Sequence, residues 1–174
     1  MDASHAQHAL YFLTGSSGSG KSTLLERVKA DVYPGLRAMH LDAHQLGYDA
    51  SGWIRAALEP PTGSALIVAD AQERPSALIE AARSLGLARL HVVLVDCGHA
   101  ERRRRLLEDR RQPELDTLDM YAWAAYLRGQ CDALGLERID TTDRPLEHSV
   151  ADLAASLERY ARSVGITLER TGGA

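Results

Sequence analysis

The sequence has little lysine and little cysteine, and it has no long apolar run. Lys21 and Lys29 are its only lysines, so almost every positive charge is an arginine. Cys97 and Cys131 are far apart and lack metal-binding or redox spacing, which is typical of reduced core cysteines in a cytosolic protein. No apolar run approaches the roughly 20 residues of a membrane span, and the N-terminus lacks the pattern of a signal peptide. We therefore expect a soluble, cytoplasmic protein without a membrane partner.

The overall charge also excludes some partners. The net charge is −4 with 25% charged residues, so nothing attracts the whole chain to nucleic acid, although a local arginine patch could still hold an end phosphate. With 174 residues, of which 45% are hydrophobic, the chain can bury one substantial core. We predict a single domain over residues 1–170 and a flexible tail over 171–174. The sequence leaves the oligomeric state open.

Short apolar runs alternate with amphipathic segments of helical period, which is typical of parallel βαβ units. The predicted strands are 9–14, 37–41, 65–69, 91–96 and 136–139, and the predicted helices are 21–32, 52–58, a segment opening at Pro75, 101–111, 117–134 and 146–164. The first strand is apolar throughout, as expected for a central strand that is buried on both faces.

The sequence from Gly15 to Ser22 fits the phosphate-loop pattern G-x-x-x-x-G-K-[ST] in full, between a buried strand and a helix. Glycines let the backbone turn around an anion, and the helix adds the positive end of its dipole. In this pattern Lys21 contacts the β- and γ-phosphates, and the Ser22 hydroxyl completes the shell of Mg²⁺. A flexible linker would not lie between such a strand and helix. The predicted nucleotide-binding residues here are Gly15, Ser16, Ser17, Gly18, Ser19, Gly20, Lys21, Ser22 and Thr23.

Three aspartates, Asp42, Asp70 and Asp96, fall at predicted strand ends, where parallel sheets place their ligands. Asp70 suits a direct or water-mediated contact with Mg²⁺. Asp42 follows a different strand and could accept the proton of an attacking hydroxyl. Each aspartate could instead be a helix cap or a turn residue. Tyr48 and Trp53 either line an acceptor pocket beyond Asp42 or only pack the short helix.

The segment 101–111 holds six arginines. Arginines can stabilise the charge on a transferring phosphoryl group or lie flat on a purine base. Helix geometry prevents all six from pointing the same way, so most must be solvated or paired with nearby acids. We predict catalytic roles for Arg105, Arg110 and Arg111, which lie towards the loop at Pro113.

Together, these features resemble the small P-loop kinases, which include nucleoside monophosphate, gluconate and shikimate kinases and chloramphenicol phosphotransferase. The resemblance rests on the phosphate loop, on Asp42, on Val93 to Asp96 with the arginine segment after it, and on Ile139-Asp140-Thr141-Thr142. It implies a three-layer α/β/α fold with a five-stranded parallel sheet in the order 2-3-1-4-5. It also implies ATP with Mg²⁺, an arginine-rich lid over about residues 100–116, and contacts of Thr141 and Thr142 with the base.

These features favour an ATP-dependent kinase of a small hydroxylated molecule, such as a nucleoside, a sugar or an antibiotic-like acceptor. Nucleoside monophosphate kinases usually carry a larger helical insertion between the second and third strands. Here the stretch from Asp42 to Gly63 has room for about one helix, so the resemblance makes a nucleotide acceptor less favoured. The base-reading segment of a GTPase is missing, and Asp70 lacks the following carboxylate of a motor ATPase. The alternative is a non-catalytic or weakly hydrolytic ATP-binding module that switches a protein partner. It predicts an exposed apolar patch at Tyr121, Trp123 and Tyr126.

Overall fold

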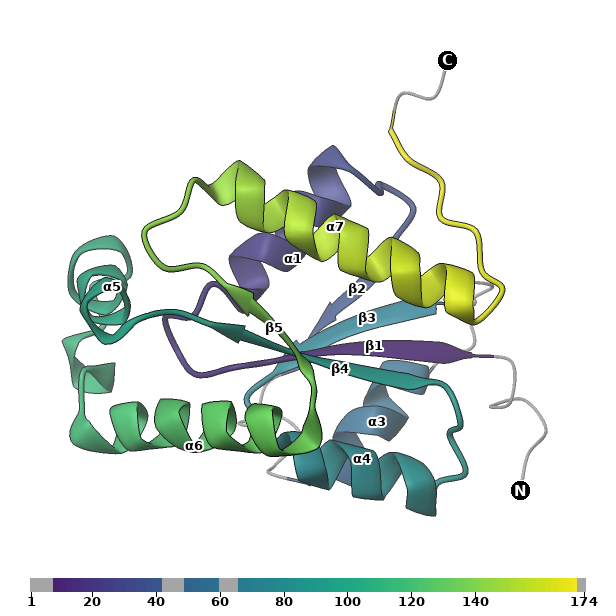
Figure 1. Cartoon of the computed structure of the whole chain (residues 1–174), viewed down its shortest axis with the longest axis horizontal. Helices are drawn as coiled ribbons and strands as arrows, with labels where there is room; N and C mark the ends of the chain where they lie inside the picture. The colour runs from purple at the N-terminus through teal and green to yellow at the C-terminus, as the bar shows by residue number, and fades with distance from the viewer. Residues whose placement is uncertain (1–7, 42–48, 60–65, 172–174) are drawn as a thin grey trace.

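Five parallel strands form the centre of the protein, and helices cover both faces of this sheet (Figure 1). The structure is a computed structural model, and it describes residues 8–41, 49–59 and 66–171. The strands lie in the order β2-β3-β1-β4-β5, which confirms the predicted P-loop fold class. Their bounds are β1 Ala9–Thr14, β2 Arg37–His40, β3 Leu66–Ala71, β4 Leu90–Asp96 and β5 Glu137–Asp140.

The helices form two layers, and one short helix lies at the carboxyl ends of the strands. In Figure 1, α1 and α7 cover the upper face of the sheet, α3, α4 and α6 lie below it, and α5 lies at its left end. Their bounds are α1 Lys21–Asp31, α3 Ala50–Leu58, α4 Pro75–Ser84, α5 His99–Arg104, α6 Leu118–Leu134 and α7 Leu146–Ser163. A π-helical turn (Arg105–Asp109) continues α5, and a 3₁₀ turn (Pro113–Leu115) follows it.

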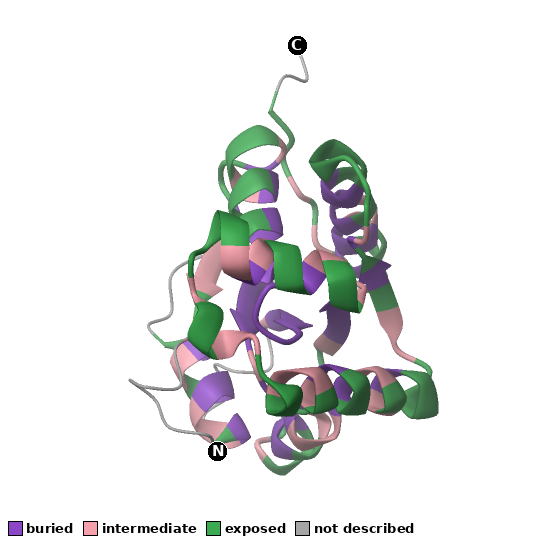
Figure 2. Cartoon of the chain, turned by 90° about the vertical axis from the view of Figure 1, so that its left-hand side faces the viewer, coloured by how far each residue is buried: buried purple, intermediate pink, exposed green. Residues whose placement is uncertain are grey.

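Two apolar cores lie on the two faces of the sheet. Odd-numbered residues of β1 pack towards α1 and α7, and Leu10 and Phe12 pack towards α3 and α4. Every residue of β1 is buried, because neighbouring strands and both helical layers enclose it. Figure 2 shows the result, with buried residues on the sheet and on the inward faces of the helices. The central strand thus gives the loop that follows it a rigid base.

The structure corrects some details of the predicted elements. Strand β3 continues to Ala71, so Asp70 lies inside the strand and not after it. The arginine segment is not one helix, because α5 gives way to the π-helical turn at Arg105. Leu134 and Leu146, two apolar residues at the ends of α6 and α7, are exposed.

The two cysteines match their predicted environment, since Cys97 and Cys131 are both buried and free. Among the residues that the structure describes, no helix combines the length and the apolar character needed to cross a bilayer.

Candidate active site

The loop between β1 and α1 has a backbone that only glycine adopts without strain. Gly18 and Gly20 have φ values of 76° and 96°, and Gly15 has a φ of 153°. No side chain caps α1, and the N–H groups from Gly20 to Thr23 find no acceptor in the described part of the chain. These N–H groups at a helix N-terminus are suited to bind phosphate oxygens. The loop therefore fits a nucleoside triphosphate.

The Gly15→Ala variant is expected to lose both stability and nucleotide binding. A Cβ atom at this position would lie 2.2 Å from the Val95 carbonyl oxygen and 2.9 Å from Ser19 Oγ. Relieving this clash must shift backbone, at a cost of about 1–3 kcal/mol. Chemical denaturation and ATP titration would measure the two effects. The matched control is Gly35→Ala, where a Cβ atom meets nothing within 4 Å. Equal stability of the two variants would contradict the proposed clash.

Lys21 is buried in the wall of the loop, with 7% of its surface exposed. Its Nζ donates a hydrogen bond to the Ser16 carbonyl oxygen at 3.3 Å. Burial lowers the pKa of Lys21 to about 8, and the charge of Asp70 only partly opposes this shift. Arg110 and Arg102 lower this pKa further through their charges. A buried cation without a full counter-charge favours the binding of an anion such as a triphosphate.

The affinity for ATP is expected to fall as the pH rises through 8. The free protein loses the Lys21 proton near that pH, whereas bound phosphates hold the proton in place. With a pKa of about 8, the dissociation constant should rise about tenfold between pH 7 and pH 9.

The free energy of unfolding of the nucleotide-free protein should increase over the pH range in which ATP affinity falls. Between pH 8 and about 10.5 the unfolded chain holds a proton that the folded chain has released, so stability rises with pH. Titration calorimetry with ATP tests the first sign, and chemical denaturation without nucleotide across the same pH range tests the second.

A chain of polar groups connects α1 to the ends of β3 and β2. Ser22 Oγ donates to Asp70 Oδ2 at 2.7 Å, and Asp70 Oδ1 lies 2.6 Å from His40 Nδ1. His40 Nε2 lies 2.6 Å from Glu26 Oε1. Because carboxylates only accept, both ring nitrogens of His40 carry hydrogen in this arrangement. Burial alone would lower the pKa of His40, but the hydrogen bond to Glu26 and the charge of Asp70 outweigh it, and the pKa is raised.

This arrangement fits Mg²⁺ at the position predicted from the sequence. The Ser22 hydroxyl and the buried Asp70 carboxylate are adjacent oxygen groups, which are ligands that Mg²⁺ prefers. Within the described residues, no group of three or more histidine, cysteine or acidic side chains forms a preformed metal cage. Such a site agrees with Mg²⁺ that arrives with the phosphates and keeps several water molecules.

The six arginines of segment 101–111 have four different environments. Arg102 is buried against Asp96, and Arg103 and Arg104 form surface ion pairs. Arg105 lies against the phosphate loop, whose Gly18 and Ser19 carbonyl oxygens it contacts at 3.3 Å. The side chains of Arg110 and Arg111 are exposed and have no ion pair with any described residue. Arg105 therefore faces the phosphate loop and not Pro113, whereas Arg110 and Arg111 are free to bind a ligand.

Thr141 lies beside Arg105, and together they form one rim of the loop. Arg105 Nη1 donates to Thr141 Oγ1 at 2.8 Å, and Nη2 donates to the Thr141 carbonyl oxygen at 2.7 Å. Both side chains lie within 4 Å of a Cβ atom built on Gly20. Thr142 faces away from this rim, and its Oγ1 accepts from Gly98 N at 2.7 Å. Thr141 therefore borders the phosphate loop and Thr142 borders Gly98, and the contact of either with the base stays a prediction. Thr23 is exposed on α1.

The opposite rim of the loop, beyond β3, has polar residues that the sequence analysis did not single out. Gln72 Nε2 donates to Ser17 Oγ at 2.7 Å, and Thr14 Oγ1 donates to the Glu73 carbonyl oxygen. Glu73 is buried, and its Oε1 accepts from Arg74 N at 2.7 Å. Gln72 and Glu73 line a pocket of about 370 Å³, to which Arg74 and Trp123 also contribute among the described residues. Gln72 and Glu73 directly follow the third strand, and this position at a strand end could have marked them in the sequence as candidate site residues.

Of the three residues predicted on the acceptor side, the structure describes Trp53. Asp42 and Tyr48 lie outside the described residues. Trp53 belongs to the core between the sheet and α3, with 1% of its surface exposed. It packs the short helix against the sheet, as the second of its two predicted roles has it, and it is absent from the pocket linings that the described residues form.

Comparison with solved structures shows the same arrangement of strands and helices in several small kinases. A shikimate kinase from Acinetobacter baumannii in complex with shikimate has a TM-score of 0.54 and 16% identity, over 90% of this chain and 94% of that one. The chain has the fold of the small P-loop kinases. A gluconokinase from Sinorhizobium meliloti 1021 has a TM-score of 0.55 and 16% identity, over 91% of this chain and 97% of that one.

An APS kinase from Mycobacterium tuberculosis, in complex with AMPPNP and APS, also has this fold. Its TM-score is 0.52 and its identity 16%, over 88% of this chain and 99% of that one. No protein-family model matches the sequence, and no curated protein matches it. At this identity the likeness shows the fold, and the chemistry must be argued from the residues of this chain.

Proposed function

We propose that this protein is a cytoplasmic, ATP-dependent phosphotransferase that moves the γ-phosphate of ATP to a hydroxyl of a small molecule. One observation carries the proposal: a complete phosphate loop with a buried Lys21, and with Ser22 bonded to Asp70 of β3, lies between an arginine rim and a polar pocket. A site for phosphoryl transfer needs these parts: a cradle for the donor, cations for the developing charge, and a place for the acceptor.

The donor half rests on the loop and its first rim. Lys21 would contact the β- and γ-phosphates, and Ser22, with Asp70 behind it, would hold Mg²⁺, whose charge would offset that of the phosphates. Arg105, held flat by two hydrogen bonds to Thr141, offers a guanidinium face to the base. Arg110 and Arg111 follow it, and we assign them to a lid over residues 100–116. Arg110 is close enough to act on the pKa of Lys21, which supports its place near the γ-phosphate.

The acceptor half lies beyond β2 and β3. In the reaction a hydroxyl oxygen of the acceptor forms a bond to the γ-phosphorus, the bond to the β–γ bridging oxygen breaks, and ADP leaves. The hydroxyl proton needs a carboxylate, and Asp42 is our candidate. Its support is that His40, two residues earlier, bonds to Asp70, so β2 ends beside the loop. Glu73 and Arg74 in the neighbouring pocket offer an acceptor and a donor for polar groups of a small substrate.

The competing function is an ATP-dependent switch that only binds a partner protein. It required an exposed aromatic patch on α6, but Tyr121 and Trp123 are half-buried and only Tyr126 is exposed. Tyr121 stacks on His99 with the ring centroids 3.8 Å apart, and its hydroxyl donates to Asp116. This geometry favours the enzyme over the switch.

The test is to measure ADP production with panels of sugars, nucleosides and aminoglycosides. An acceptor of the correct class should raise ADP release well above the rate with ATP alone. The Arg74→Ala variant should then raise the KM for that acceptor and leave the affinity for ATP unchanged. The matched control is Arg83→Ala, an exposed position on α4. Tight ATP binding with no acceptor effect across all panels would favour the switch.

A further inference from the structure

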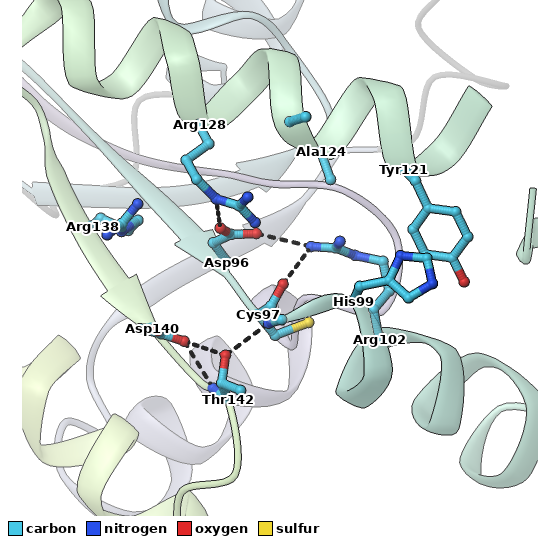
Figure 3. A pocket seen from close by; sticks show the side chains of 12 residues that line it. Asp96, Cys97, His99, Arg102, Tyr121, Ala124, Arg128, Arg138, Asp140 and Thr142 are labelled. Atoms are coloured by element: carbon cyan, nitrogen blue, oxygen red, sulfur yellow. Dashed lines mark hydrogen bonds and ion pairs between the residues drawn. The ribbon is translucent and has the colours of Figure 1, made fainter. Parts of the chain in front are cut away.

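A second pocket lies on the side of β4 and β5 that faces α6. It has a volume of about 470 Å³ and is bordered by α5, α6 and β5 (Figure 3). Neither the phosphate loop nor the Glu73 pocket contributes to its lining. Among the described residues, its lining has one positive charge in excess, from three arginines and two aspartates: Arg102, Arg128, Arg138, Asp96 and Asp140.

A buried ion-pair network forms the inner wall of this pocket. Asp96 Oδ1 accepts from Arg102 Nη2 at 2.8 Å, and Asp96 Oδ2 accepts from Arg128 Nε at 2.7 Å. Arg102 is 2% exposed, and its Nε has no hydrogen-bond partner in the described part of the chain. Its side chain packs on Gly18, where an added Cβ atom would be 3.1 Å from Arg102 Cγ. Arg102 thus separates the pocket from the phosphate loop.

Two arginines present unused donors to the pocket from two different elements. Figure 3 shows Arg128 reaching down from α6 and Arg138 lying on β5. Arg128 uses only Nε for Asp96, and its two Nη groups donate to no described residue. Within the described part of the chain, the one ion pair of Arg138 is a loose one with Asp132, at 4.0 Å. Guanidinium groups with free forked donors are the groups that recognise phosphate best.

The remaining lining adds a hydrogen-bond acceptor and an apolar surface. Asp140 Oδ1 accepts from the N–H and the hydroxyl of Thr142, at 2.9 and 2.5 Å, and this leaves Oδ2 unused by the described residues. Ala124 and Ala125 supply a small apolar surface on α6. A free phosphate ion would use the arginines alone. A phosphate ester with hydroxyl groups would also use Asp140.

We propose that this pocket binds a small phosphate monoester with a hydroxylated body, such as a sugar phosphate, separately from the nucleotide. Arg128 and Arg138 hold the phosphate, and Asp96 keeps Arg128 in place. Asp140 accepts a hydrogen bond from a hydroxyl group of the ligand. The pocket volume lies within the range of small-molecule sites. This site goes beyond the proposed phosphotransferase activity, and its existence does not depend on that activity.

The test is calorimetric titration of the full chain with ribose 5-phosphate or inorganic phosphate, after saturating the phosphate loop with Mg-AMPPNP. We expect ribose 5-phosphate to bind the loaded protein and to bind more tightly than inorganic phosphate. The Arg138→Ala variant should weaken this binding by at least about tenfold, since it removes charged hydrogen bonds. The matched control is Arg27→Ala, which also removes an exposed arginine from an ion pair, with Asp31 on α1, and should bind like the wild type.

Three results would each overturn the proposal. The first is that saturation with AMPPNP abolishes binding, which would place the phosphate in the loop. The second is wild-type affinity in the Arg138→Ala variant. The third is equal affinity for inorganic phosphate and ribose 5-phosphate, which would exclude a contribution from Asp140. The proposal is supported if Arg138→Ala loses the binding of ribose 5-phosphate and keeps its affinity for AMPPNP. This result would not depend on whether any acceptor raises ADP release.

Discussion

The Lys21→Ala variant is expected to lower kcat/KM for ATP by about three orders of magnitude, because it removes the buried cation that stabilises charge on the phosphates. Its stability should stay equal or rise at neutral pH. The ammonium group is buried at a cost in the free protein, as its lowered pKa of about 8 shows, and alanine removes that cost. Steady-state kinetics and chemical denaturation on the same preparation would measure both effects.

The matched control for this variant is Lys29→Ala, which changes the only other lysine, on the same helix but outside the loop. It should leave kcat/KM close to the wild-type value. If Lys21→Ala were strongly destabilised, the lost activity could be ascribed to misfolding. If it turned over like Lys29→Ala, Lys21 would have no part in the reaction.

The Asp96→Ala variant is expected to cause the largest loss of stability, about 3–5 kcal/mol, because it leaves the buried Arg102 without its counter-charge. Arg128, the second partner of Asp96, is partly exposed and can be rehydrated. Urea denaturation should show a lower midpoint with an unchanged slope.

A double variant separates the lost charge pair from a simple packing defect. Adding Arg102→Met to Asp96→Ala removes the unpaired charge and should restore a large part of the loss. The control is Arg103→Ala, which breaks the exposed ion pair with Asp116 and should cost at most about 1 kcal/mol. A double variant no more stable than Asp96→Ala would contradict a charge-based cost.

The phosphate loop could be predicted from sequence because its chemistry is local. Eight consecutive residues fix the turn, the lysine and the hydroxyl, and the apolar strand before them fixes their setting. The same holds for the three central strands β3, β1 and β4, which are short, largely apolar runs that end close to their predicted bounds. Asp70 could be predicted as a site residue for the same reason, because it closes a run of apolar residues that marks a buried strand.

The rims of the site could not be predicted, because they depend on contacts between distant parts of the chain. Arg105 bonds to Thr141, 36 positions away, and only packing of the π-helical turn against the loop brings them together. The turn itself changes the helical phase, as the bond from Arg110 N to the Arg105 carbonyl shows. Arg102, which the sequence did not separate from its neighbours, lies in α5 before this turn, where it is buried between Asp96 and Gly18.

The most direct test of the proposed function is to follow the fate of the γ-phosphate by phosphorus-31 NMR. The reaction contains the protein, Mg-ATP and the acceptor that most stimulates ADP release. A phosphotransferase predicts that the γ-phosphate signal is replaced, mole for mole with ADP, by a phosphate-ester signal of the acceptor. The Lys21→Ala variant should produce neither. Appearance of the γ-phosphate only as inorganic phosphate, or no change in ATP with any acceptor, would contradict the proposal.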